Sequence, residues 1–239
     1  MYRIPLFLII VMLLTTVSCK NENSQTESKQ RPYTIAEELL FDDFSSDSQL
    51  WLAEGIEPKL TDGMLELDSP TGSTIWLIPS LQGNVLIEYD VTIPIFDEPV
   101  AAQTRLGCFF MAADPADTNN MFTKSQERKG DFQEYSDLNL YYLGLGCGEN
   151  SSMQLTKYNK GDYELLAECA DVSLSIEHGK KYRIQLFFYG NTIELCGNEK
   201  ALFCTQDLEP YTQGHFGLTA VGHVLMDNFK ITHLRRPET

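Results

Sequence analysis

Positive charge is scarce in this sequence. Its 239 residues include 18 Lys and Arg against 34 Asp and Glu, which gives a formal net charge of −16. So few bases cannot neutralise a run of phosphates, and this excludes nucleic acid as a partner. The same shortage argues against electrostatic adhesion to anionic lipid. An anionic polysaccharide would have to bind at a local cluster of the few basic residues.

Cysteine and histidine are too few and too scattered for a metal or disulfide framework. The sequence has no CxxC pair and no zinc-ligand spacing, and it also lacks Gly-x-Ser-x-Gly and phosphate-loop motifs. Apart from Cys19, we expect the cysteines to be small buried hydrophobic residues, with at most one disulfide among them. These cysteines are Cys108, Cys147, Cys169, Cys196 and Cys204.

Long apolar runs are missing except near the start of the chain. Leu6 to Leu14 is an unbroken apolar run that follows Arg3. It is shorter than the roughly 20 residues of a membrane-spanning helix, and small residues follow it, so it predicts a signal peptide over residues 1–18. Thr16-Val17-Ser18-Cys19 resembles a bacterial lipobox, which implies a lipid on Cys19. The alternative is ordinary cleavage, with Cys19 there by chance.

The residues after Cys19 are polar as far as Tyr33. Residues 19–33 therefore predict a lipidated cysteine followed by a flexible tether. The protein would then contact a membrane only through the lipid on Cys19. This favours an exported lipoprotein of the outer membrane or cell surface, with one folded domain over residues 34–239.

From about residue 38 onward the apolar pattern has a period of two residues rather than 3.6. The alternating segments are short, rich in Val, Ile, Phe, Tyr and Thr, and separated by Gly, Pro, Asn and Asp. They predict an all-β fold, a two-sheet antiparallel β-sandwich or jelly roll. The expected strands are residues 64–68, 74–78, 84–93, 105–112, 138–146, 163–169, 181–189, 192–196, 201–204, 215–221 and 224–234, with a hairpin turn at Gly197-Asn198.

Alternation also predicts which side chains share a face of the sheet. Tyr141 faces away from Leu140 and Tyr142, and Asp227 shares a side with Phe229. A sheet that is polar but aromatic on its outer face suits sugar binding, because rings cover the C–H face of a pyranose while polar groups bond its hydroxyls. The alternative is a solvated outer face with scattered aromatic residues.

The longest weakly patterned stretch runs from Asp114 to Asp137. Loops of this length in a compact domain are usually functional or disordered. Much of the scarce positive charge lies here, so we expect the rim of a binding cleft, with a mobile surface loop as the alternative. The residues that suggest a rim are Lys124, Arg128, Lys129, Glu134 and Tyr135.

The order of several short blocks resembles a known family. The order resembles the concanavalin A-like jelly-roll domains of secreted carbohydrate-degrading bacteria, and is most similar to the uncharacterised DUF6250 family, near DUF1961. The blocks are residues 40–45 (LFDDFS), 62–67 (DGMLEL), 83–90 (GNVLIEYD), 108–112 (CFFMA), 130–135 (GDFQEY), 141–146 (YYLGLG), 214–218 (GHFGL) and 227–231 (DNFKI).

The resemblance covers residues 38–234. It implies two facing antiparallel sheets, adjacent first and last strands, and a concave sheet used for glycans, but no established reaction. Two features depart from the family pattern: residues 150–158 lack its arginines, and Thr219 stands where an arginine often follows the Phe-Gly-aliphatic block.

Carboxylates at i and i+2 of a strand share a face at a spacing that suits a glycosidase pair. Glu88 and Asp90 have that spacing, but the glucanases of this fold use Glu-x-Asp-x-x-Glu and position 93 is Ile. We therefore interpret Glu88 and Asp90 as structural or exposed residues. Asp43 and Asp227, at the two ends of the domain, either bind a structural Ca²⁺ or cap turns without a metal, and we favour capping.

A lyase or hydrolase on the concave sheet needs a base, an acid and a group that neutralises substrate charge. The candidate catalytic residues are Glu134, Tyr135, Tyr141 and His215. The candidate substrate-binding residues are Arg105, Arg128, Lys129, Arg183 and Tyr142. The sequence thus predicts a glycoside hydrolase or polysaccharide lyase, with a non-catalytic glycan-binding lipoprotein and a purely structural sandwich as alternatives. No organic cofactor is expected.

Overall fold

The chain divides into a unit over Met1–Arg31 and a compact unit over Pro32–Thr239. The computed structural model describes residues 33–95, 104–118, 120–146, 152–169 and 176–237. The expected signal peptide, Cys19 and Cys147 lie outside these residues. Within them, no helix is both long and apolar enough to cross a membrane.

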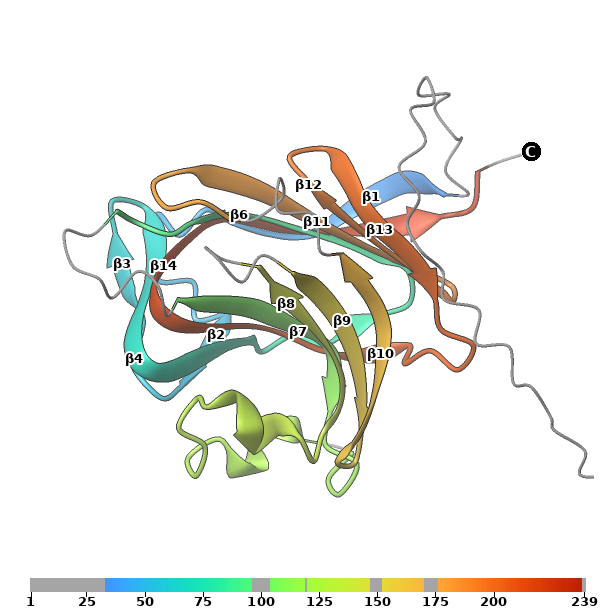
Figure 1. Cartoon of the computed structure of the whole chain (residues 1–239), viewed down its shortest axis with the longest axis horizontal. Helices are drawn as coiled ribbons and strands as arrows, with labels where there is room; N and C mark the ends of the chain where they lie inside the picture. Colours follow the sequence, from blue (N-terminus) through green and yellow to red (C-terminus); the bar gives the residue numbers. More distant parts are fainter. Residues whose placement is uncertain (1–32, 96–103, 119, 147–151, 170–175, 238–239) are drawn as a thin grey trace, which may run out of the picture. The chain divides into compact units, whose positions relative to one another are not determined.

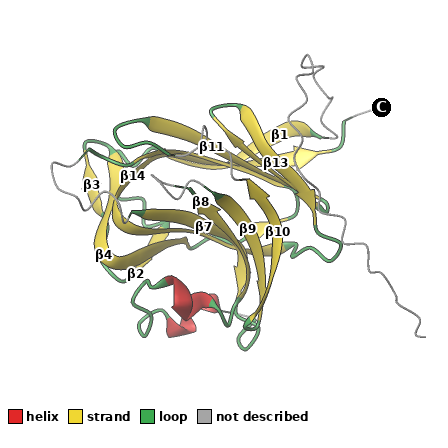
Figure 2. Ribbon diagram, in the orientation of Figure 1, coloured by secondary structure: helices red, strands yellow, loops and turns green. Residues whose placement is uncertain are grey.

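Antiparallel strands are by far the main secondary structure of the described residues, so the predicted all-β class is confirmed. Figure 2 shows two short helical turns as the exception. The strands are β1 (Thr34–Asp42), β2 (Trp51–Glu54), β3 (Lys59–Thr61), β4 (Met64–Leu77), β5 (Leu81–Gln82), β6 (Val85–Thr92), β7 (Arg105–Ala113), β8 (Asn139–Leu145), β9 (Met153–Asn159), β10 (Asp162–Cys169), β11 (Lys181–Tyr189), β12 (Thr192–Gly197), β13 (Lys200–Gln206) and β14 (Gln213–Arg235).

The strands form two facing layers that share two long strands (Figure 1). In the first layer, β10, β9, β8 and β7 lead to the first half of β14, which pairs with the second half of β4 and then β2. In the second layer, β13, β12, β11 and β6 lead to the second half of β14, which pairs with β1 and the first half of β4. The first and last strands are adjacent, as expected.

The core lies between the two layers and consists of apolar residues at alternate strand positions. Leu186 and Phe188 of β11 face Leu143 and Phe110 of the first layer within one cluster. Lys181, Arg183, Gln185, Phe187 and Tyr189 alternate with the core residues of β11 and lie on the outer side of the second layer. Cys108, Cys169, Cys196 and Cys204 carry thiols, and burial raises the pKa of Cys108 to about 12.

A β-bulge in β14 changes which side chains face the core. Asn228 has a left-handed backbone (φ 49°), and the pairing with β6 shifts between Asp227 and Lys230. The extra residue reverses the alternation, so Met226 and Phe229 are both buried while Asp227 lies outside. The prediction that Asp227 shares a side with Phe229 is therefore wrong.

Candidate functional site

The outer face of the first layer is lined by small residues and aromatic rings. Gly107 of β7 lies opposite Thr219 of β14 on one side and Gly144 of β8 on the other. Directly opposed residues of antiparallel strands share a face. Since Leu106 and Cys108 point into the core, this row points outward, away from the second layer.

The segment from Asp114 to Leu138 folds onto part of this face. Its two 3₁₀ turns, η2 (Met121–Lys124) and η3 (Phe132–Tyr135), lie beside β2 and the first layer in Figure 2. A Cβ on Gly130 would lie 2.4 Å from the carbonyl oxygen of Glu54, so only glycine permits this close approach. The segment is thus a docked part of the domain that walls the outer face.

A buried carboxylate fastens the segment. Oε2 of Glu54 accepts hydrogen bonds from the Tyr135 hydroxyl at 2.7 Å and the Trp76 indole at 3.0 Å. Oε1 of Glu54 pairs with the Arg128 guanidinium at 3.3 Å. The two hydrogen bonds and the ion pair offset the cost of burying the Glu54 carboxylate.

A groove of about 160 Å³ stays open between the docked segment and the strands. Its floor comes from β7, β8 and β14, and its wall from the start of η3. The lining residues are Thr71, Arg105, Leu106, Gly107, Gly130, Asp131, Phe132, Tyr142, Thr219, Ala220 and Val221.

Tyr142 forms a ring platform in this groove. A Cβ on Gly107 would lie 2.6 Å from Cε2 and 2.8 Å from the hydroxyl oxygen of Tyr142, and a Cβ on Gly144 would lie 3.3 Å from Cε1. The ring therefore lies across both glycines, which leave room for it. Phe132 adjoins it at a centroid distance of 4.5 Å.

The platform continues as a row of rings over neighbouring strands. Phe132 meets Tyr158 of β9 at 5.8 Å between ring centroids, and Tyr158 meets Tyr163 of β10 at 6.0 Å. Tyr163 is 74% exposed. Such an exposed aromatic row offers successive surfaces for apolar faces of a chain-like ligand.

Polar groups surround the platform. Arg105 is exposed and has no ion-pair partner among the described residues. Thr219 bonds with Thr74 at 3.0 Å between hydroxyl oxygens. Asp131 is the only acid among the described residues of the groove. One acid, one base and hydroxyls can bond a polyol, but they lack the pair of carboxylates that hydrolysis of a glycoside usually uses.

Of the candidate substrate-binding residues, the structure brings Arg105 and Tyr142 together in the groove. Arg128 lies instead on Glu54 within the docked segment. Arg183 lies on the outer face of the second layer, where it pairs with Glu88 at 3.4 Å and Asp90 at 3.2 Å. Both acids are therefore partnered, in agreement with their structural interpretation.

Both candidate tyrosine bases are buried outside the groove. Tyr135 bonds Glu54, and burial, followed by the charge of Glu54, raises its pKa well above the usual value. Tyr141 bonds Asp207 at 2.5 Å within the core between the layers, and burial followed by this hydrogen bond raises its pKa in the same way. The prediction that Tyr141 faces outward is wrong, because that strand turns Leu140 and Tyr142 to the outer face.

The remaining catalytic candidates do not meet. Glu134 accepts a hydrogen bond from the Lys129 backbone N–H at 2.6 Å, and this contact lies at the exposed surface of the segment. Glu134 lines a separate hollow of about 330 Å³, whose other lining residues include Lys124. Nδ1 of His215 lies 3.2 Å from the Leu77 carbonyl oxygen, in another hollow of about 230 Å³.

The two acids considered for Ca²⁺ each have hydrogen-bond or ion-pair partners within the protein. Oδ1 of Asp43 accepts the Ser45 N–H at 3.0 Å, and the side-chain and backbone hydrogen bonds of Ser45 lower the pKa of Asp43. Asp227 accepts the Asn228 N–H at 2.7 Å and pairs with Lys181 at 3.2 Å. The contact of Asp43 fits the favoured interpretation of a turn cap, whereas Asp227 lies within β14 at its bulge and caps no turn.

Most of the groove lining has no recognisable signal in the sequence. Asp131 and Phe132 belong to the family block at residues 130–135 but carry no sign of a binding role, and Gly107 stands between core residues with nothing to mark it. The one available signal was Thr219, where the family pattern often has arginine. That position lines the groove.

The chain belongs to the family described as a domain of unknown function (DUF6250), whose sequence profile matches residues 67–229. This confirms the expected family. No curated protein matches the chain.

Solved structures show the same fold at low sequence identity. A Bacillus subtilis protein of unknown function with a galectin-like fold is 19% identical, with a TM-score of 0.71 over 86% of this chain and 100% of its own. The Bacillus subtilis carbohydrate-binding module CBM66 is 15% identical (TM-score 0.55; 77% and 95% covered). A structure from human gut bacteria, described with endo-acting O-glycanases that initiate mucin breakdown, is 8% identical (TM-score 0.58; 83% and 100% covered). These likenesses support the concanavalin A-like jelly roll as the fold.

Proposed function

We propose that this domain binds a glycan in the groove over Tyr142. The observation that carries the proposal is the Tyr142 ring, which lies across Gly107 and Gly144 in an open hollow beside Arg105. A sugar ring stacks its C–H face on such a platform while its hydroxyls bond charged and hydroxyl side chains. The name of the similar module CBM66, a carbohydrate-binding module, supports the same function.

Groove variants in a glycan-array screen test the proposal. The purified protein is screened, and the best oligosaccharide is then titrated against Tyr142→Ala and Arg105→Gln. We expect each variant to bind at least about tenfold more weakly, a loss of about 1.4 kcal/mol. Arg183→Gln is the matched control, because Arg183 lies on the other layer, and it should bind like the parent protein. Equal affinity in Tyr142→Ala, with unchanged thermal unfolding, would refute the proposed site.

A hydrolase or lyase is the second candidate function. It is supported by the similarity to a structure described with endo-acting O-glycanases. Asp131 is then the acid available in the groove. Release of reducing or unsaturated ends from the bound glycan, lost in Asp131→Asn while binding persists, would establish catalysis. Binding with no product release over long incubation would leave a carbohydrate-binding protein.

We also propose that the domain is displayed as an exported lipoprotein of the outer membrane or cell surface. The support is the apolar run Leu6–Leu14 followed by Cys19 and a polar tether. Expressed in a bacterium that processes lipoproteins, the parent chain should fractionate with membranes and Cys19→Ala should not. Identical fractionation of both chains would contradict lipid anchoring.

A further inference from the structure

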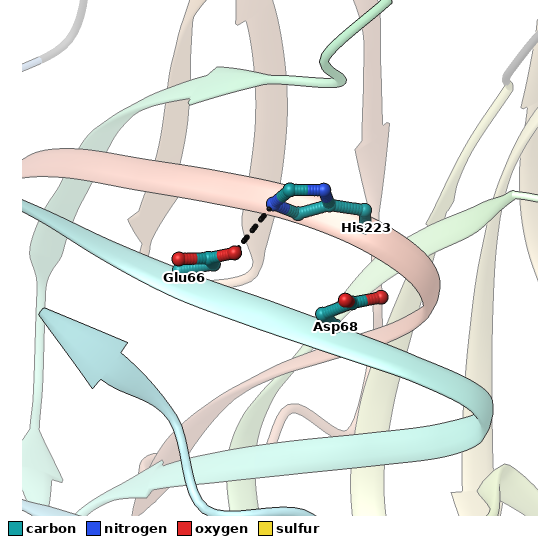
Figure 3. Close-up of side chains that lie close together, drawn as sticks. All are labelled: Glu66, Asp68 and His223. Carbon is teal, nitrogen blue, oxygen red and sulfur yellow. Dashed lines mark ion pairs between the residues drawn. The ribbon is translucent and has the colours of Figure 1, made fainter. Parts of the chain in front are cut away.

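Three metal-ligating side chains gather on the outside of the domain where β4 pairs with the second half of β14. Asp68 lies directly opposite His223, and Glu66 lies opposite Leu225, two residues further on. Because Leu65, Leu67, Val224 and Met226 fill the core, their neighbours Glu66, Asp68 and His223 point outward together (Figure 3).

The donor atoms of these side chains are already close. Nε2 of His223 lies 2.9 Å from Oε1 of Glu66, and single donor atoms of Glu66, Asp68 and His223 all lie within 4.8 Å of one another. Metal–ligand bonds of about 2.0–2.2 Å in a tetrahedral site place neighbouring donors about 3.3–3.6 Å apart. Small side-chain rotations therefore bring the donors to metal-binding distance.

The surroundings hold one ligand in place and leave another accessible. Oε2 of Glu66 accepts a hydrogen bond from the Thr61 hydroxyl of β3 at 2.6 Å, which leaves Oε1 directed at His223. Hydrogen bonds of this kind orient the ligands of metal sites. Asp68 is exposed, and the side chains of His223 and Glu66 are 20% and 15% exposed, so an ion can enter from solvent.

We propose that Glu66, Asp68 and His223 bind a divalent first-row transition metal ion, with Zn²⁺ as the probe. One imidazole with two carboxylates suits zinc or manganese better than Ca²⁺, which takes oxygen ligands only. Three protein ligands leave a fourth position for water. The site lies where β4 and β14 pass from one layer to the other, since Val221 of the groove is two residues before His223. A bound ion would therefore fasten this crossing.

Metal titration of the purified protein tests the site. Equilibrium dialysis against Zn²⁺ with metal analysis should give one ion per chain. Asp68→Asn and His223→Asn should each weaken binding by at least about tenfold. His233→Asn, on the same strand, is the matched control and should bind like the parent protein. Asp68 is exposed, so Asp68→Asn gives a folded variant even if changes at the half-buried His223 disturb packing.

Two results would overturn the proposal. One is the absence of stoichiometric Zn²⁺ binding in the parent protein. The other is Zn²⁺ binding by Asp68→Asn and His223→Asn that equals the binding by the parent protein. Glu66 and His223 would then only pair with each other and would not form a metal site. Because these variants lie outside the groove, their glycan affinity reports separately on the proposed function.

Discussion

Single residues divide the outer face of the first layer into a closed part and an open part. Glu54 gathers Arg128, Tyr135 and Trp76, and so closes the area beneath the docked segment. Gly107, in the neighbouring area, has no side chain, so the Tyr142 ring can lie directly over its backbone. The size of each side chain at these positions therefore decides where a ligand can enter.

Removal of the Glu54 charge should destabilise the domain strongly. In Glu54→Gln the Arg128 guanidinium stays buried without its counter-charge, which costs about 3–5 kcal/mol in comparable buried pairs. Chemical denaturation measures this loss. The control is Glu177→Gln, because the Glu177–Lys180 pair is exposed, and we expect a loss below about 1 kcal/mol. Similar losses in the two variants would contradict the fastening role of Glu54.

His215 should make stability depend on pH. Burial lowers its pKa below 6.5, although hydrogen bonds to the carbonyls of Leu77 and Ile78 oppose the shift. As pH falls below 6.5, the unfolded chain takes up a proton that the folded chain resists, so stability is lost until the folded pKa is reached. Denaturation midpoints between pH 7.5 and pH 5, compared with His215→Gln, measure this. A parent protein whose stability falls no more steeply than that of the variant would rule it out.

At the scale of elements, β14 depends on its bulge. Asn228 adopts φ 49° and donates from its amide to Oδ2 of Asp90 at 2.9 Å. The bulge turns Asp227 outward and Phe229 inward, which lets the strand contribute to both layers. A change in this one residue therefore affects the pairing of a whole strand.

Asn228→Val should destabilise the fold, whereas Asn228→Gly should do so much less. A β-branched residue is strained at positive φ by about 1–3 kcal/mol, and glycine is not. Both variants lose the bond to Asp90, so their difference isolates the backbone term. Urea denaturation of the two proteins gives it. Equal stabilities would show that the left-handed conformation is not required.

At the scale of the whole molecule, the first and last described strands pair with each other. β1 pairs with the last residues of β14, and the Asp42 carboxylate at its end accepts the Trp51 indole N–H at 2.9 Å. Phe44 is buried next to Trp51, with ring centroids 5.8 Å apart. Stability of the second layer therefore depends on residues far from it in sequence.

Truncation should reveal this dependence. A chain that begins at Ser45 lacks β1, Asp42 and Phe44, and we expect it to lose cooperative unfolding and near-ultraviolet circular dichroism. A chain that begins at Pro32 keeps them and should unfold cooperatively. Cooperative unfolding of the shorter chain at the same midpoint would contradict the account.

The sequence predicts most strands of the two layers well. Every second side chain of these strands is buried and apolar, and this alternation is visible in the sequence. The β11 segment alternates cleanly, and its predicted bounds are those of the structure. The β1 segment was not predicted, since Ala36-Glu37-Glu38-Leu39-Leu40 has no alternation and is a strand only through its pairing with β14. β9 was missed because only Met153 and Leu155 face the core.

The site is predicted less completely, because strand register and bulges decide which side chains meet. Arg105 and Arg183 look alike in sequence, yet one lies in the groove and the other on the opposite layer. His223 matched no metal spacing, since its neighbours Glu66 and Asp68 come from a strand far away in the chain. No sequence pattern marks such pairings.

The most direct test of glycan binding at Tyr142 is a crystal structure of the protein with the oligosaccharide that binds best. We expect a sugar ring stacked on Tyr142, at about 4 Å, with a hydroxyl or charged group bonded to Arg105. A sugar bound elsewhere on the domain, with the groove over Gly107 unchanged, would contradict the account.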